Sequence, residues 1–266
     1  MSNTPISLID THAHPYLLEY YKDQEEQKNC IERAKKNHIE AVVLPNIDLK
    51  STEEMFELYG LFPSFYYLMM GLHPTSVKEN WEDELEKIKN AFTDKNICGI
   101  GEVGIDLYWE KKYKEQQIRA FKQQIEWAFD MNLPLSIHAR DSFNEIDEVL
   151  QDFDFSVKKN PGVFHCFSGD EIQAEKLITR GFKLGIGGVV SFKNAGLDKI
   201  VANIDLKHLV LETDAPFLAP MPHRGKRNES AFLLLIAEKI AEIKQVSIKQ
   251  VAEITTQNAK KLFKIR

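Results

Sequence analysis

Short apolar runs recur along the whole chain, and each is followed by a longer segment with helical spacing. The runs are continuous rather than alternating, which is typical of strands buried on both faces of a parallel sheet. The predicted strands are 7–9, 41–44, 66–71, 97–100, 135–137, 162–164, 183–185 and 209–211.

The segments between these runs carry apolar residues at the spacing of a helix face. In 114–131, Ile118, Phe121, Ile125 and Phe129 form one stripe, which predicts packing against a core. Ser247 is the expected N-cap of the last helix, although the Glu of a capping box is missing. The predicted helices are 24–37, 52–61, 82–92, 114–131, 143–151, 171–180 and 197–202, with 230–244 and 248–263 as two closing helices.

Strands that alternate with helices predict βαβ units and a parallel sheet. Eight repeats indicate a single (β/α)8 TIM barrel over residues 1–266, a fold that typically needs roughly 250 residues. A seven-stranded variant also fits the pattern, because the strand boundaries are not sharply marked. No linker rich in Pro, Gly or Ser divides the chain.

The net charge of -6 argues against a protein that coats long duplex nucleic acid. It leaves room for a pocket that handles one phosphate with metals and a few local cations. No apolar stretch approaches the roughly 18 residues of a membrane span. Residues 1–5 do not resemble a secretion signal, and Cys30, Cys98 and Cys166 contain no CxxC pair. We therefore expect a cytoplasmic protein with reduced thiols, no membrane partner and a monomeric state.

His12 and His14 follow the first predicted strand. Residues two apart in a strand share a face, so both imidazoles leave the strand end together and make a half-site for a divalent metal. Imidazole or carboxylate side chains also follow four later strands; they are Glu102, His138, His165 and Asp214.

The carboxyl ends of barrel strands converge on one rim, so these six side chains are expected to meet. Four histidines and two carboxylates exceed the four ligands of a structural zinc site and predict two divalent metals. A metal lowers the pKa of bound water from about 15.7 towards 7, so no protein nucleophile is needed. The ligand types accept Mg²⁺, Mn²⁺ or Zn²⁺. The His165–Cys166 pair is not expected to act as a nucleophile, because neighbouring strand residues face opposite sides and the thiol should pack against helices.

These motifs resemble the TatD family of metal-dependent deoxyribonucleases, in the amidohydrolase-like TIM-barrel superfamily. The matching stretches are 10–14, 71–74, 101–106, 137–141, 163–169, 212–220 and 223–228. The resemblance implies that one metal is held by His12, His14, Glu102 and Asp214, and the other by Glu102, His138 and His165. It also implies that Asp214 accepts a proton from the attacking water, and that Mg²⁺ supports activity.

One departure from the family pattern is visible in the first motif. The family usually continues it as His-x-His-Leu-Asp, whereas His14 is followed here by Pro15 and Tyr16. Neither replaced position is a metal ligand in that pattern, so the metal site should survive. The shape of the loop behind it, and with it substrate preference, is the open point.

Six further residues are candidates for substrate binding, each with a structural alternative: His73, Arg140, Arg224, Arg227, Tyr108 and Trp109. His73 could donate to a phosphate, serve an additional metal or stabilise its own Gly-x-His-Pro turn. Arg140 could face the pocket or pair with Asp141. The basic run that contains Arg224 and Arg227 fits phosphate binding or a solvated loop. The two aromatic residues could stack an unpaired base or pack as a lid.

The leading functional hypothesis is a 3′–5′ exodeoxyribonuclease that acts on single-stranded or frayed DNA ends, with two metals and Asp214 as general base. A second hypothesis keeps the metals and changes the bond to an ester or amide, as in a D-aminoacyl-tRNA deacylase. The basic run mildly favours a phosphate-containing substrate. A third hypothesis is a non-catalytic, metal-stabilised barrel that binds nucleic acid.

Overall fold

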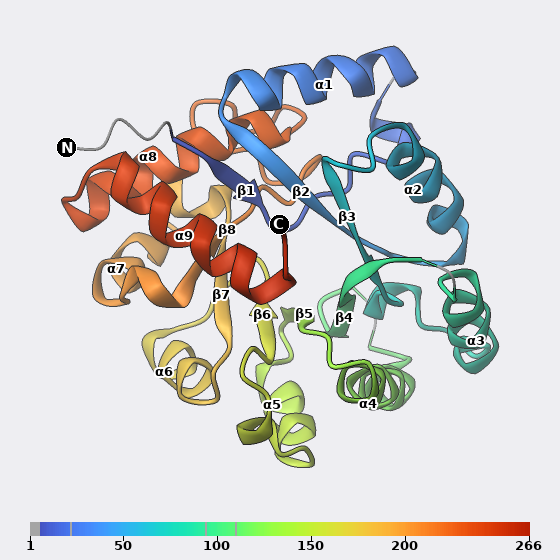
Figure 1. Ribbon diagram of the computed structural model, residues 1–266. Coiled ribbons are helices and arrows are strands. Elements are labelled where there is room, and N and C mark those ends of the chain that lie inside the picture. The colour runs from blue at the N-terminus through green and yellow to red at the C-terminus, as the bar shows by residue number, and fades with distance from the viewer. Residues whose placement is uncertain (1–5, 22, 94, 110) are drawn as a thin grey trace.

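The structure, a computed structural model, describes residues 6–21, 23–93, 95–109 and 111–266. Within these ranges, eight parallel strands form one sheet in chain order, with the helices around it (Figure 1). This confirms the predicted eight-stranded TIM barrel over the seven-stranded variant, whereas the expectation for residues 1–5 lies outside the described residues. The strands are β1 Leu8–Asp10, β2 Ile39–Pro45, β3 Tyr66–Met70, β4 Ile97–Asp106, β5 Leu135–Arg140, β6 Gly162–Phe164, β7 Lys183–Ile186 and β8 Leu209–Leu211.

The barrel is closed by backbone hydrogen bonds between the segments at the ends of β1 and β8. The amide of Thr11 donates to the carbonyl of Leu211 at 3.0 Å, and the amide of Asp214 donates to the carbonyl of His12 at 2.9 Å. Ala13 and Ala215 form an isolated parallel bridge just beyond. Closure therefore holds the first histidine pair against the segment that carries Asp214.

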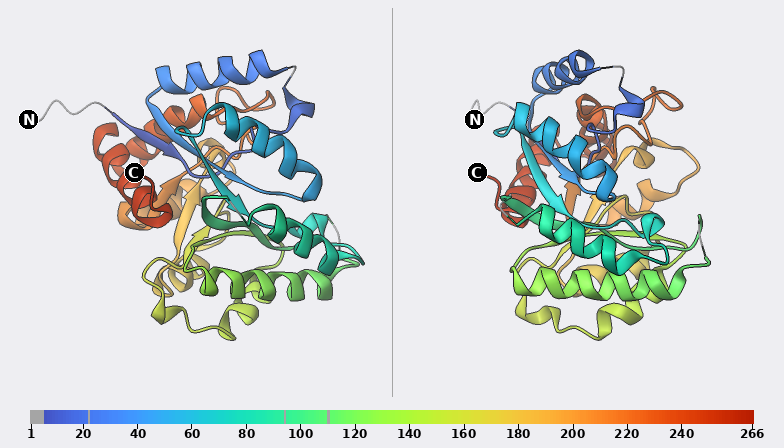
Figure 2. Two further views of the ribbon diagram at one scale, coloured as in Figure 1. Left: turned by 45° about the vertical axis from the view of Figure 1, so that its right-hand side comes forward. Right: turned by 90° about the vertical axis from the view of Figure 1, so that its right-hand side faces the viewer.

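The helices surround the barrel, as the two further views make plain (Figure 2). Ser247 caps the last helix by accepting from the amide of Gln250, as predicted. In the described part of the chain, no helix is both long and apolar enough to cross a membrane. The α-helices are α1 Gln24–Lys36, α2 Leu49–Leu61, α3 Trp81–Ala91, α4 Lys114–Asp130, α5 Phe143–Gln151, α6 Glu171–Thr179, α7 Leu197–Asn203, α8 Leu233–Lys244 and α9 Ile248–Phe263.

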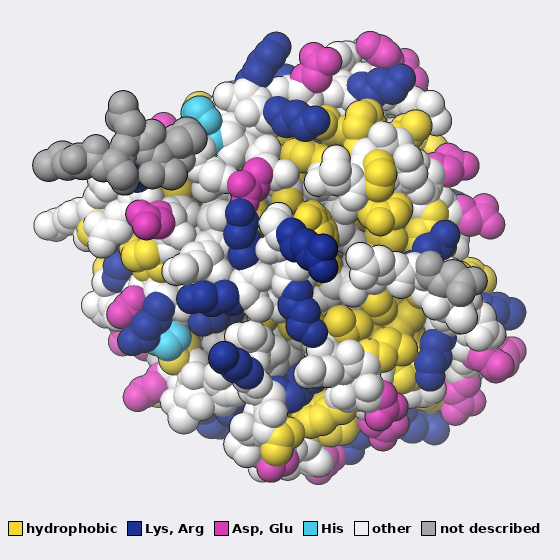
Figure 3. Space-filling model, viewed as in Figure 1, with side chains coloured by type: hydrophobic (Ala, Val, Ile, Leu, Met, Phe, Trp, Pro, Cys, Tyr) yellow, Lys and Arg dark blue, Asp and Glu magenta, His cyan; other side chains and the backbone are white. Residues whose placement is uncertain are grey.

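The end of α9 covers the amino-terminal opening of the barrel, where the chain ends in the middle of the ring of strands in Figure 1. Leu262 and Phe263 pack against the inward-facing Ile9, Val43 and other residues at the bottoms of the strands. Lys and Arg side chains gather around the middle of this face (Figure 3). Catalytic residues of barrel enzymes lie at the opposite, carboxyl-terminal end.

Strands β4 and β5 are longer than their apolar runs predicted. They continue to Asp106 and Arg140, so Glu102 and His138 lie within strands rather than after them. Gly104 allows this pairing, because its φ is 140° and a Cβ there would lie 2.1 Å from the carbonyl oxygen of His138. Glycine has low strand propensity, and for that reason the apolar pattern did not predict the glycine-rich half of β4 as a strand.

A partly buried ion-pair cluster ties α5 to α6. Asp147 on α5 accepts from Lys176 at 2.9 Å and from Arg180, at the end of α6, at 2.6 Å. Burial raises the pKa of Asp147, but the two cations outweigh it and lower the pKa below its usual value. The cluster therefore stabilises the fold while Asp147 is ionised.

Replacing Asp147 by Asn should lower the free energy of unfolding by about 1 kcal/mol at neutral pH. For a protein of this size the melting temperature should fall by about 2–4 °C. A carboxyl whose pKa is lowered on folding contributes its full stabilisation above its unfolded pKa of about 3.9, so the difference from wild type should shrink as the pH falls below that value and disappear once the pH has passed the lower pKa of the folded state. Thermal unfolding monitored by circular dichroism from pH 3 to 8 measures this.

The matched control is Asp152→Asn, which removes the pair with Lys122, whose side chains are 56% and 41% exposed. Because solvent screens that pair, the control should shift the melting temperature less than Asp147→Asn does. A loss in Asp147→Asn that is the same at pH 3 and pH 8 would contradict the ion-pair account.

Candidate metal centre

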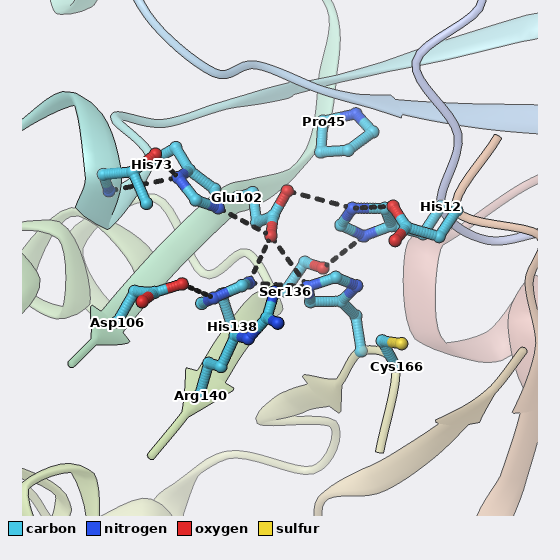
Figure 4. Close-up of polar contacts among 12 residues, drawn as sticks. His12, Pro45, His73, Glu102, Asp106, Ser136, His138, Arg140 and Cys166 are labelled. Carbon is cyan, nitrogen blue, oxygen red and sulfur yellow. Dashed lines mark hydrogen bonds and ion pairs between the residues drawn. The ribbon is translucent and has the colours of Figure 1, made fainter. Parts of the chain in front are cut away.

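The Glu102 carboxylate lies at the centre of the carboxyl-terminal end of the barrel, between two sets of imidazoles (Figure 4). Its Oε2 is 3.1 Å from Nε2 of His12 and 3.5 Å from Nε2 of His14. Its Oε1 is 2.8 Å from Nδ1 of His138 and 2.7 Å from Nε2 of His165. One carboxylate thus faces a different histidine pair with each oxygen.

Asp214 joins the first of these sets. Its Oδ1 is 3.6 Å from Nε2 of His14 and 4.0 Å from Nε2 of His12. The side chain is 14% exposed, whereas that of Glu102 is 4% exposed. The structure therefore brings together all six residues that the sequence singled out as metal ligands, and Asp214 is the carboxylate of the two that solvent reaches.

The second ring nitrogen of His138 is held by Asp106, the last residue of β4. Oδ2 of Asp106 accepts from Nε2 of His138 at 2.9 Å, while its Oδ1 accepts from the amides of Tyr108 and Trp109 at 3.0 and 2.9 Å. A neutral His138 therefore has its proton on Nε2 and its lone pair on Nδ1, towards Glu102. Such outer partners fix the tautomer and orientation of a ligating imidazole.

Two further residues lie beside the outer nitrogens of His12 and His165, and only the first is within hydrogen-bond distance. Nδ1 of His12 is 3.2 Å from the Ser136 hydroxyl, and Nδ1 of His165 is 3.6 Å from Oε1 of Glu212. Ser136, Asp106 and Glu212 were not among the residues predicted for the site. A signal for two of them was present, because Ser136 and Glu212 precede His138 and Asp214 by two positions.

His73 follows β3 and reaches the same carboxylate, with its Nε2 3.1 Å from Oε1 of Glu102. Its Nδ1 accepts a hydrogen bond from the amide of Thr75 at 3.1 Å. A nitrogen that accepts carries no proton, so a neutral His73 donates from Nε2 to Glu102. This geometry favours a role for His73 in orienting Glu102; its contact with substrate remains a prediction.

The charges of the cluster are strongly coupled. Burial raises the pKa of Glu102, but His165, His73 and His12 outweigh it and hold the pKa well below its usual value. Burial lowers the pKa of His14, but Asp214 and Glu102 outweigh it and raise the pKa to about 9. Without another cation, buried carboxylates of this kind are compensated by protonated imidazoles.

The donor set fits divalent metals. Among the described residues, three groups place their ligand atoms within 4.8 Å of one another: His12–His14–Glu102, His12–His165–Glu212 and His73–Glu102–His138. Nδ1 of His165 and Oε2 of Glu212 are buried without a hydrogen-bond partner. Imidazole nitrogens and carboxylate oxygens that converge in this way suit Zn²⁺, Mn²⁺ or Mg²⁺.

Arg140 and the two aromatic candidates form one group on the rim. The Arg140 guanidinium lies 4.1 Å from the ring centroid of Tyr108 and 5.3 Å from that of Trp109. The rings are 54% and 67% exposed, so the aromatic pair is not packed as a buried lid. Arg140 is exposed and continues β5 beyond His138 (Figure 4).

The two arginines of the basic run have different surroundings. Arg224 is exposed and lies 4.5 Å from the ring centroid of Phe192. Arg227 pairs with Glu26 on α1, donates to the carbonyl of Tyr20 at 3.3 Å and lies over the ring of Tyr21. Arg227 therefore stabilises the contact between its loop and α1, and these contacts do not favour its predicted role in phosphate binding.

A cleft of about 320 Å³ adjoins the metal centre between the loops that follow β5 and β6. Its lining includes His165, Cys166, Ser168, Asp141 and Phe143. The expectation that Cys166 packs against the helices was wrong, because β6 ends at Phe164 and strand alternation no longer applies. Burial raises the pKa of Cys166 well above its usual value, so the thiol stays protonated.

The sequence matches a known family along almost its whole length. A model of the family described as "TatD related DNase" matches residues 9–264. The chain belongs to the TatD-related DNase family. It is 38% identical over 262 residues to YabD of Bacillus subtilis (strain 168), which is described as an uncharacterized metal-dependent hydrolase. The match covers 97% of this chain and 99% of that protein.

Other relatives of this TatD-family protein extend over the same length. YcfH of Escherichia coli (strain K12), also described as an uncharacterized metal-dependent hydrolase, is 30% identical over 259 residues, with 97% of this chain and 96% of that protein covered. The crystal structure of YjjV, a TatD homolog from Escherichia coli K12, has a TM-score of 0.88 at 24% identity and covers 97% of this chain and 98% of that one. The structural match concerns the fold alone.

Replacing Glu102 by Gln should abolish retention of both ions, because the same carboxylate faces both histidine sets. We expect wild type to retain two divalent ions per chain after dialysis, and Glu102→Gln to retain none under the same conditions. Elemental analysis of the dialysed proteins gives the ratio. Glu79→Gln is the matched control, since that carboxylate is 68% exposed and pairs with Lys112. Two ions retained by Glu102→Gln would refute the bridging role.

Proposed function

We propose that this protein is a divalent-metal-dependent hydrolase that cleaves phosphodiester bonds of DNA. The observation that carries the proposal is the Glu102 carboxylate, which faces one histidine pair with each oxygen. Membership of the TatD-related DNase family supports both the reaction class and the substrate. The description of YabD as a metal-dependent hydrolase supports the requirement for metal.

In this proposal two divalent ions bind on the two sides of Glu102, with Mg²⁺ as the expected ion in activity and Mn²⁺ or Zn²⁺ also accommodated. When bound, such ions polarise a phosphoryl oxygen and lower the pKa of water. One side would be held by His12, His14, Glu102 and Asp214, and the other by Glu102, His138 and His165.

Asp214 is the proposed general base. Its carboxylate is 14% exposed, so water can reach it, whereas the Asp106 and Glu212 side chains are 1% and 0% exposed. The closing hydrogen bond from its amide to the carbonyl of His12 holds it beside the histidine pair. A carboxylate held in this way can take the proton of an attacking water.

The rim suggests an unpaired DNA end as the substrate. Exposed aromatic rings stack unpaired bases without regard to sequence, and Tyr108 and Trp109 lie on the strand-end loop behind Asp106. Arg140 beside them supplies positive charge at the rim. The net charge of -6 argues against wrapping a duplex. We therefore propose an exonuclease that acts on single-stranded or frayed ends, with 3′–5′ as the direction to be tested.

The direct test is digestion of 5′-end-labelled single-stranded DNA with added Mg²⁺ or Mn²⁺. Wild type should shorten the labelled strand progressively from its 3′ end, and a chelator should stop the reaction. Asp214→Asn should slow digestion by about 100-fold or more, because a general base contributes about 10²–10⁴ in rate.

Three results would contradict parts of this proposal. Equal digestion by wild type and Asp214→Asn would refute the role of Asp214 as general base. Intact DNA together with metal-dependent deacylation of a D-aminoacyl-tRNA would move the reaction to a carbonyl ester. DNA binding that is unaffected by chelator, with no cleavage of either substrate, would indicate a non-catalytic barrel.

Replacing Trp109 by Ala should weaken binding of single-stranded DNA by roughly 5- to 150-fold, because stacking on an aromatic residue is worth about 1–3 kcal/mol per base. The dissociation constant should be measured by fluorescence anisotropy in the Asp214→Asn background, where cleavage does not interfere. Val157→Ala is the control, since Val157 is a 71% exposed apolar residue after α5. An oligonucleotide with an abasic 3′ end should bind wild type and Trp109→Ala equally; a preserved difference would argue against stacking on the base.

A further inference from the structure

Pro15 and Tyr16, the departure from the family pattern, form a tight turn behind the metal centre. The amide of Leu17 donates to the carbonyl of His14 at 3.2 Å, so Pro15 and Tyr16 are the two central residues of the turn. Proline is common at the first central position of such turns, because its ring restricts φ to the value that this position needs. The turn places the Tyr16 ring beside His14, with ring centroids 5.7 Å apart, and leaves the tyrosine with no exposed surface.

The Tyr16 hydroxyl bridges His14 and the end of β2. It donates to the carbonyl of Pro45, the last residue of that strand, and its oxygen lies 2.8 Å from Nδ1 of His14. A hydroxyl has one hydrogen and a carbonyl oxygen can only accept, so the hydroxyl accepts the bond from the histidine. His14 therefore carries a proton on Nδ1.

That proton position leaves Nε2 of His14 for a metal. Nε2 is 3.5 Å from Oε2 of Glu102 and 3.6 Å from Oδ1 of Asp214, on the first side of the bridging carboxylate. The imidazole has a second fixed point, because its own amide donates to the carbonyl of Ala215 at 2.6 Å. The ring is thus held at both its backbone and its outer nitrogen.

We propose that Tyr16 is a positioning residue that holds His14 in the tautomer and orientation required to bind metal, with its phenol in the place of the usual acidic side chain. This inference rests on the proposed metal centre. It concerns one of the two ions, because Tyr16 contacts neither His138 nor His165 through any hydrogen bond of the described residues. An outer partner of a metal-binding histidine typically changes affinity by about 10- to 100-fold.

The test is a Zn²⁺ titration of metal-free wild type, Tyr16→Phe and Tyr66→Phe in competition with a chromophoric chelator. Wild type should bind two ions. Tyr16→Phe should bind one ion about 10- to 100-fold more weakly and leave the other affinity unchanged. Tyr66→Phe should match wild type in both affinities, because it removes a different buried phenol, at the amino-terminal start of β3.

Long-range ¹H–¹⁵N spectra of the Zn²⁺-loaded proteins give a second measurement. They should show His14 with its proton on Nδ1 in wild type and a changed signal for this ring in Tyr16→Phe, with the other site histidines unaltered. Unchanged affinities in Tyr16→Phe, or equal losses in Tyr66→Phe, would overturn the role of Tyr16 while leaving the metal centre intact. Failure of wild type to bind any ion would instead overturn the proposed function and this inference with it.

Discussion

The structure depends on keeping one ionised carboxylate buried at the end of a barrel. Glu102 is 4% exposed, yet the pKa of its carboxyl lies well below the usual value because imidazoles contact both of its oxygens. A buried charge without such partners would be strongly destabilising. The partners come from segments far apart in the chain, so the cluster exists only when β1, β3, β5 and β6 are in their places. Folding and assembly of the site are therefore the same event.

Most histidines around Glu102 are contacted at both ring nitrogens, one by the Glu102 carboxylate and the other by an outer partner. Outer partners come from four different parts of the barrel: Ser136 for His12, Tyr16 for His14, Thr75 for His73 and Asp106 for His138. The partners of His14, His73 and His138 also fix which ring nitrogen carries the proton, so the fold sets the direction of these lone pairs before a ligand arrives. Asp106 extends this constraint outwards, because the same carboxylate anchors the backbone of the exposed aromatic pair.

Much of this could be predicted from apolar periodicity and strand-end chemistry. Seven of the eight strands of the described chain agreed with their predicted bounds to within three residues, because parallel strands buried on both faces leave an uninterrupted apolar signal. Glu102 was misplaced relative to its strand because the Gly-rich half of β4 pairs through backbone that no side-chain pattern reports. The contact of Ser136 with His12, the contact of Tyr16 with Pro45 and the pairing of Arg227 with Glu26 were missed for another reason: they join residues about 30 to 200 positions apart, which no local pattern relates.

The covering of the barrel floor by α9 has a consequence for the newly made protein. Leu262 and Phe263 cover Ile9 and Val43, which a ribosome delivers more than 200 residues earlier. At about 5–20 residues per second the nascent chain keeps that apolar floor open to water for on the order of ten seconds or longer. During translation the chain thus lacks the helix that covers the apolar residues at the amino-terminal end of the barrel. The finished fold cannot shield this surface from aggregation in that interval, because α9 is the last helix to be made.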